Sequence, residues 1–307
     1  MWRAAPSSAP TTRLSWATIS GDYDDISRSI DPIMPANWPL PKFIRRDRAR
    51  ERIIGALKPV IDRRRRNPEQ YNDLITQVLA QPEKDGGAPS DEDIVRLFMG
   101  LLFAGHETTA GQAAWTVIQL LQNPDYLRLV QDEIGAVVAP GQAIDGGVLR
   151  NLEHVYWAIE ETTRLKPSAP MQMRIVEEDL DLGDVVVPAG WLIKVSAATS
   201  HHNEAAFAEN EQYDPLRFAP GRDEGKNTFN IIGFGGGIHK CTGMNFAKNE
   251  MAVVVALLFQ QFDVELVTQD PRVVTGLGAN HPSEAIVRYR RKGNAETISA
   301  PLDAVAV

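Results

Sequence analysis

The sequence predicts a mainly α-helical protein with a smaller β part. Apolar residues recur at helical spacing in several long segments, the last of them near the C-terminus. Alternating or β-branched runs between residues 179 and 198, and again after residue 262, indicate short strands. Hydrophobic residues make up 43% of the 307 residues, enough for a sizeable core.

Charge and cysteine content narrow the function classes. The net charge of −8 argues against general nucleic-acid binding. A single cysteine excludes an intrachain disulfide and fits a reducing compartment, so we expect a cytoplasmic protein. The longest apolar run, residues 251–259, is much shorter than the roughly 20 residues of a membrane helix. No membrane span is therefore expected.

The N-terminal region contains three different segments. Residues 1–21 contain Ser and Arg but no acid, which faintly resembles an organelle transit peptide or reflects a misplaced gene start. We leave this head unassigned and expect it to be disordered. Four prolines in residues 31–43 predict an irregular connector. Next comes a basic amphipathic helix, ending in the arginine run 63–66. A solvated helix end explains this run better than a membrane or nucleic-acid patch. Its apolar face is formed by Ile53, Ile54, Leu57, Val60 and Ile61.

A long central helix is expected next. Residues 81–90 read as a loop, and Ser90 with Asp93 three residues later forms a capping box. The helical pattern runs to about Asn123, where Pro124 stops it, giving a helix roughly 50 Å long. Two shorter helices follow at residues 124–138 and 152–165.

The C-terminal half combines strands with one more long helix. Residues 179–198 predict strands broken at Gly183 and at residues 188–190. Residues 262–267 and 285–292 are further strand candidates. The helix that follows Cys241 is expected to bury one face, formed by Ala247, Met251, Val254, Val255, Leu258 and Phe262.

The sole cysteine lies in a distinctive context. Cys241 stands where a glycine-rich loop runs into a helix, so backbone N–H groups can point at its sulfur and favour a thiolate. A zinc site would need more ligands at short spacing, and only His239 is near. The glycines match neither a dinucleotide-binding fingerprint nor a P-loop. A lone cysteine is often only a small buried hydrophobe. One thiolate beneath a bulky planar cofactor such as haem remains the better fit.

The spacing of this segment resembles the haem-binding motif of the cytochrome P450 family. The matching positions are Phe234, Gly237, His239, Cys241 and Gly243. The resemblance implies haem b (iron protoporphyrin IX) with Cys241 as its axial thiolate ligand, and a hydrogen bond from residue 239 to a haem propionate. Most members carry arginine at position 239. Histidine there is similar to the sterol 14-demethylase branch and its bacterial relatives.

Three further segments agree with the family in order. The stretch AGHETT, residues 104–109, resembles its oxygen-activating motif, which implies that Glu107 is the acid and Thr108 the alcohol. Ala104 and Gly105 would leave room for the flat cofactor. Glu161 and Arg164 match the ExxR motif, and residues 215–218 match the later PxRF motif that supplies Arg217. These three charged residues would form a structural network, although ExxR alone is usually a surface ion pair. Arg174 matches an arginine that binds a propionate.

The resemblance covers a partial domain, residues 22–297, followed by a tail at 298–307. The usual N-terminal third has no counterpart, so we expect apolar faces to be exposed. The resemblance implies a haem-thiolate monooxygenase acting on a small lipophilic substrate. It would draw electrons from NAD(P)H through a separate ferredoxin and its reductase or a flavoprotein. Two alternatives stay open: a truncated haem-binding fragment without activity, and a helical interaction protein with an inert cysteine.

Overall fold

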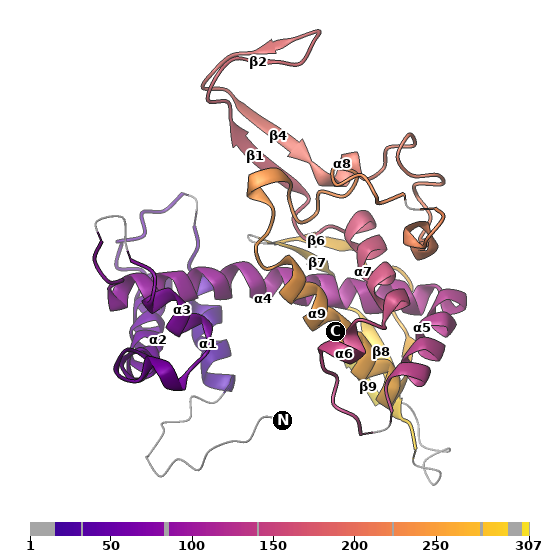
Figure 1. The fold of residues 1–307 in the computed structure, drawn as a ribbon, viewed down its shortest axis with the longest axis horizontal. Coiled ribbons are helices and arrows are strands. Elements are labelled where there is room, and N and C mark those ends of the chain that lie inside the picture. The colour runs from indigo at the N-terminus through magenta and orange to yellow at the C-terminus, as the bar shows by residue number, and fades with distance from the viewer. Residues whose placement is uncertain are drawn as a thin grey trace. The chain divides into compact units, whose positions relative to one another are not determined.

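The computed structural model describes residues 16–31, 33–82, 86–139, 141–222, 224–276, 279–293 and 303–306. The head to residue 15, and much of the tail, lie outside these residues. The chain divides into two compact units, residues 1–104 and 105–307. The boundary falls inside the long helix α4, Asp91–Gln122 (Figure 1).

The first unit is helical. Helix α1, Trp16–Ser27, begins within the segment left unassigned from sequence. Helix α2, Pro41–Arg66, starts earlier than the four-proline pattern suggested, because a proline at the first helical position needs no N–H partner. The short elements η1, Pro68–Gln70, and α3, Leu74–Leu79, follow. A core of Ile61, Ile75, Ile94 and Val95 joins α2, α3 and α4, and Ile54, Leu57 and Val60 pack against it as expected.

Arginines at the end of α2 contact nearby acidic and aromatic side chains of the same unit. Arg64 donates to Asp73 at 2.9 Å, and its guanidinium carbon lies 4.2 Å from the Tyr71 ring centroid. Arg65 donates to Asp91 at 2.6 Å, at the start of α4. These contacts support a helix end rather than a binding patch.

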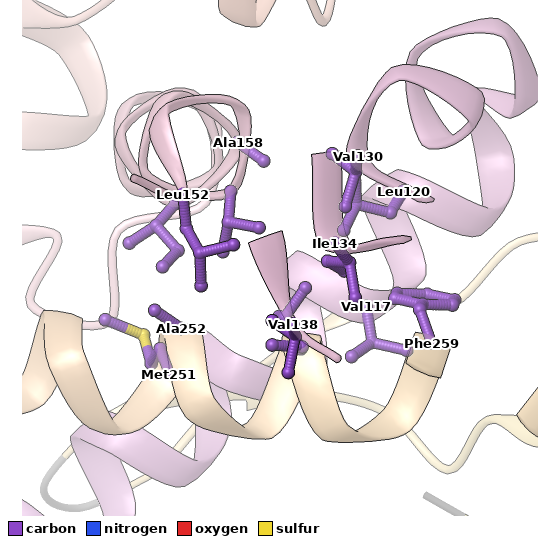
Figure 2. Close-up of a cluster of buried hydrophobic side chains, with 14 of the residues drawn as sticks. Val117, Leu120, Val130, Ile134, Val138, Leu152, Ala158, Met251, Ala252 and Phe259 are labelled. Atoms are coloured by element: carbon purple, nitrogen blue, oxygen red, sulfur yellow. The ribbon is translucent and has the colours of Figure 1, made fainter. Parts of the chain in front are cut away.

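Four helices build the core of the second unit. They are the C-terminal half of α4, α5 (Pro124–Val137), α7 (Glu153–Leu165) and α9 (Met244–Gln261). A four-residue helix, α6 (Gly146–Leu149), also contacts α9. Figure 2 shows apolar side chains of these helices turned toward one another. Among the described residues, no helix is both long enough and apolar enough to cross a bilayer.

The buried face of α9 agrees with the prediction in part. Met251 and Val255 are buried and Ala247 and Leu258 pack against the core, as expected, whereas Val254 is 43% exposed. Ala252, Ala256 and Phe259 are also buried. The helix is apolar on more than one side, so hydrophobic spacing alone does not fix which side faces the core. Both sides of this helix therefore carry large apolar groups, as the expectation of exposed apolar faces implied.

The strands form small antiparallel sheets. Strands β1 (Met171–Ile175) and β4 (Leu192–Ser196) pair in a hairpin that extends away from the helices, with β2 (Leu180–Asp181) paired to β3 (Val186–Val187) at its far end (Figure 1). Several apolar side chains of this hairpin are exposed. The other pairings join β5 (Phe262–Leu266), β8 (Ile286–Arg291) and β9 (Asp303–Ala306), and β6 (Val273–Thr275) with β7 (Asn280–Pro282).

Candidate functional site

The loop that carries Cys241 is closed by backbone hydrogen bonds. The Cys241 N–H donates to the Phe234 carbonyl at 2.7 Å, and the Gly235 N–H donates to the Ile232 carbonyl at 2.8 Å. Gly235 has a φ of +76°, and a Cβ there would lie 2.7 Å from the carbonyl oxygen of His239. Only glycine fits this turn. A short 3-10 turn, η3 (Gly237–His239), then leads to Cys241.

Cys241 stands at the entrance to α9 with its side chain exposed. Two large apolar side chains of the same segment are also exposed: Ile238 is 96% accessible and Phe246 75%. Exposed apolar side chains near an accessible thiol are typical of a place that a ligand covers. Phe234 is partly buried against the helical core, and Lys248 lies over its ring with Nζ 5.4 Å from the centroid.

Behind the loop, two arginines share one carboxylate, as the sequence predicts for Glu161, Arg164 and Arg217. Arg164 of α7 donates from Nε and Nη2 to the two Glu161 oxygens, at 2.8 Å each. Arg217, in the 3-10 turn η2 (Pro215–Phe218), donates from Nε to Glu161 Oε1 at 3.0 Å. All three side chains are fully buried. Arg217 also pairs with Glu224 at 2.5 Å, so two positive and two negative charges are balanced.

The remaining guanidinium protons of Arg164 are satisfied by backbone carbonyls. Arg164 donates to the carbonyls of His201, Asn210 and Gln212. Both guanidinium groups lie near the buried Phe207 ring. The guanidinium carbon of Arg164 is 5.1 Å from the ring centroid, and that of Arg217 is 5.8 Å from it. This network fixes the path of the segment between the short helix α8 (Ala197–Ser200) and η2 against α7.

His201, to which the sequence assigned no role, joins this network to the cysteine loop. Its ring Nδ1 lies 2.9 Å from the Arg164 carbonyl, and the Ile232 N–H donates to its Nε2 at 2.8 Å. Because a backbone N–H can only donate, Nε2 is unprotonated and Nδ1 carries the proton. Burial, together with the nearby Arg164 and His202, lowers the pKa of His201 to about 4. A neutral His201 therefore bridges α7 and the loop.

Strand β1 holds the same point of the loop from the other side. Gln172 Nε2 donates to the Ile232 carbonyl at 2.7 Å, and Gln172 Oε1 accepts from Arg174 Nη2 at 3.3 Å. Arg174 also donates to the Met173 carbonyl at 2.8 Å. The Ile232 peptide is thus clamped by His201 and Gln172, and the predicted propionate-binding Arg174 belongs to the same group of contacts.

The close packing of the loop on α7 depends on Gly233. A Cβ at this position would lie 2.6 Å from Cγ2 of Thr163, a residue within the predicted ExxR segment. The loop backbone can therefore rest directly on the helix that carries Glu161 and Arg164. Packing and hydrogen bonds together bring two of the sequence-predicted motifs into one assembly.

Of the predicted residues on the central helix, three lie in the second unit. Gly105 is its first residue, and Glu107 and Thr108 follow on α4, partly buried. The Thr108 hydroxyl donates to the Gly105 carbonyl at 3.4 Å, one helical turn back. The Thr108 carbonyl accepts from the Ser168 hydroxyl at 3.0 Å. Ala104 is the last residue of the first unit.

The residues around Cys241 suit a cofactor that takes a single protein ligand. Among the described residues, no group of three or more His, Cys, Asp or Glu side chains could hold a metal ion. The thiol is accessible, its loop is rigidly held, and exposed apolar side chains flank it. A planar cofactor ligated by one thiolate fits these features, whereas a closed zinc site does not.

The comparisons with known proteins agree with this geometry. The family model of cytochrome P450 matches residues 23–287, and the chain belongs to that family. In this family the cofactor is, in general, a haem with a cysteine thiolate ligand. A solved structure of cyanobacterial CYP120A1 with retinoic acid bound has the same fold, with a TM-score of 0.77 at 24% identity. The match covers 89% of this chain and 63% of that chain.

Curated relatives include sterol 14-demethylases. The chain is 30% identical over 289 residues to that of Arabidopsis thaliana, covering 89% of this chain and 58% of the relative. It is 28% identical to the sterol 14alpha-demethylase of Mycolicibacterium vanbaalenii, covering 88% and 62%. The chain therefore spans about three-fifths of the length of these relatives.

Proposed function

We propose that this chain is the haem-binding part of a haem-thiolate monooxygenase, which inserts one oxygen atom from O2 into a lipophilic organic substrate. The observation that carries the proposal is the accessible Cys241 thiol on a loop clamped to the buried Glu161 network, in a member of the cytochrome P450 family. A catalytically silent haem-binding fragment is the alternative, because the chain spans only part of its relatives.

Several residues would hold the cofactor. Cys241, at the start of α9, would supply the thiolate ligand. His239 and Arg174 would donate hydrogen bonds to the propionates. When bound, haem supplies the activation of dioxygen, which the thiolate promotes by donating electron density. The remaining predicted contacts with the cofactor face are those of Ala104, Gly105, Phe234, Gly237 and Gly243.

The protein's own contribution on the oxygen side is proton delivery. The Thr108 hydroxyl, one turn from Gly105, would hold a water molecule and position it as a proton donor. The Glu107 carboxylate precedes it on α4 and would take protons from solvent and pass them to that water. An alcohol and an acid side by side would let protons pass from solvent through the carboxylate to the water that the hydroxyl holds.

The proposal extends to the substrate and the electron source. Sterol 14-demethylases act on sterols, so we infer a lipophilic, sterol-like substrate for this chain. Electrons would come from NAD(P)H through a ferredoxin with its reductase or a flavoprotein. A reducing compartment such as the cytoplasm would keep the only cysteine available as a ligand.

Haem titration followed by turnover tests the proposal. The purified chain should take up one equivalent of haem, and with NAD(P)H and a surrogate redox partner it should oxidise a sterol probe such as lanosterol. Haem uptake without turnover would favour the silent fragment. An absence of haem absorption would favour the hypothesis of a helical interaction protein. It would contradict both the monooxygenase and the silent haem-binding fragment.

Two variants separate cofactor binding from chemistry. Cys241→Ala should lose the thiolate-type spectrum of the reduced carbon-monoxide complex. Thr108→Ala should keep haem but divert the electrons of NAD(P)H to hydrogen peroxide. Wild-type coupling in the Thr108→Ala variant would count against the proposed proton delivery.

A further inference from the structure

Ser168 makes three polar contacts with the central helix α4. Its hydroxyl lies 3.0 Å from the Thr108 carbonyl oxygen and 3.1 Å from Gln112 Oε1. Its backbone N–H donates to the same Gln112 oxygen at 3.2 Å. Ser168 follows the end of α7 by three residues, so these contacts join the ExxR helix to the helix of Thr108.

The donors and acceptors of this group have one best assignment. The Ser168 N–H can only donate, so the Gln112 side-chain atom that faces it is the oxygen. Gln112 Oε1 is then satisfied by the backbone N–H of Ser168. The single proton of the Ser168 hydroxyl is left for the Thr108 carbonyl, at the shorter of its two distances.

Ser168 itself is held in place. Its carbonyl accepts the Asn280 N–H of β7 at 2.8 Å, and the residue is 8% exposed. Gln112 is 4% exposed. A buried hydroxyl fixed by neighbours on both sides has little freedom, so its hydrogen bond constrains the carbonyl that accepts it.

The Ser168 hydrogen bond constrains the backbone of Thr108. In an α-helix the Thr108 carbonyl is the acceptor for the N–H of Gln112, four residues on. A second donor at that carbonyl competes with the helical bond, so it constrains the position of the Thr108 backbone. The Thr108 hydroxyl is meanwhile turned toward the Gly105 carbonyl. Both ends of the residue are therefore placed by specific contacts.

We propose that Ser168, oriented by Gln112, is a positioning residue that sets where the Thr108 hydroxyl lies. The proposal rests on the proposed function, in which Thr108 handles protons during oxygen activation. Ser168 touches neither cofactor nor substrate in this role, and acts only through the Thr108 carbonyl.

A carbonyl NMR signal reports on the contact without any cofactor. The sequence contains three Thr-Thr pairs, at residues 11–12, 108–109 and 162–163. Labelling threonine with carbonyl ¹³C and with ¹⁵N therefore isolates the Thr108 carbonyl among three signals. Ser168→Ala should move this signal upfield, since a hydrogen-bond donor is lost, and Ser168→Thr should restore it.

A second readout tests the consequence in the haem-loaded chain. With NAD(P)H, a surrogate redox partner and lanosterol, Ser168→Ala should raise the hydrogen peroxide formed per NAD(P)H about three- to tenfold, the effect of losing one buried hydrogen bond. Ser168→Thr should return it to wild type. The matched control is Ser200→Ala, because the Ser200 hydroxyl also donates to a backbone carbonyl, that of Ser196, at 2.8 Å. It should change neither readout.

The outcomes separate this proposal from the proposed function. An unmoved Thr108 carbonyl signal in Ser168→Ala overturns the proposal. So does wild-type peroxide formation in that variant when Thr108→Ala raises it. If the wild-type chain takes up no haem, the proposed function is wrong. The Thr108 carbonyl signal of the haem-free chain still tests whether Ser168 donates a hydrogen bond to that carbonyl.

Discussion

Replacing Glu161 by glutamine should be severely destabilising. The Glu161 carboxylate accepts hydrogen bonds from Arg164 at both oxygens and from Arg217 at one of them. It also accepts the Asp214 N–H at 3.0 Å. All three charged side chains are fully buried. Glutamine keeps the size but leaves two buried guanidinium groups with only Glu224 to balance them, and it places an amide donor against arginine donors.

The expected cost is about 3–5 kcal/mol, as for breaking a buried ion pair by removing one partner. Glu160→Gln is the matched control on the same helix. Glu160 pairs with Lys248 in a partly exposed contact and should cost about 0–1 kcal/mol. Glu224→Gln, in which Arg217 keeps Glu161, should fall between them at about 1–3 kcal/mol.

Urea unfolding followed by far-UV circular dichroism measures these differences as shifts of the midpoint at constant slope. Proteins of this kind have about 5–15 kcal/mol of stability, so the glutamine variant can still fold. A Glu161→Gln variant within about 1 kcal/mol of Glu160→Gln would refute the claim that this buried network holds the second unit together.

Three further predictions concern the surroundings of the loop. The folded pKa of His201, about 4, lies below its ordinary value of 6.5, so the unfolded chain takes up the proton first as pH falls. The contribution of His201 to the free energy of unfolding should be fully present above pH 6.5 and should fall by up to about 3 kcal/mol toward pH 4. The His201→Gln variant should lose this pH dependence of stability, and the control His202→Gln should keep it. Gly235→Ala should weaken haem binding more than tenfold in a titration, because its Cβ would strike the His239 carbonyl; an affinity equal to wild type would contradict this turn geometry. Glu133 of α5 accepts the N–H groups of His154 and Val155 and so caps α7, and Glu133→Leu should lower stability by about 1–3 kcal/mol in urea, whereas no change would show that the cap is dispensable.

Local sequence signals predicted the helices well. The Ser90 hydroxyl accepts the Asp93 N–H at 3.1 Å, as the capping box required, and Pro124 opens α5 where the central helix ends. Signals of this kind depend on residues close in the chain, so one sequence is enough to reveal them. The motif spacing likewise placed Glu161 and Arg164 on one helix face, where they pair.

Contacts between segments that are distant in the chain were not predicted from the sequence. His201, Gln172 and Ser168 lie between elements or on a short strand, and no periodic pattern marks a polar residue whose partner is tens of residues away. On α9, the prediction that Val254 is buried was wrong, because Val254 is as apolar as its buried neighbours. Hydrophobicity indicates that a residue can be buried, and only packing decides whether it is.

The carbon-monoxide difference spectrum of the purified, haem-loaded chain tests the central claim most directly. We expect the absorption of a thiolate-ligated haem, and its loss in Cys241→Ala with the fold retained by circular dichroism. A chain that stays without haem absorption, or a spectrum that the Cys241→Ala variant shares, would contradict the assignment of Cys241 as the ligand.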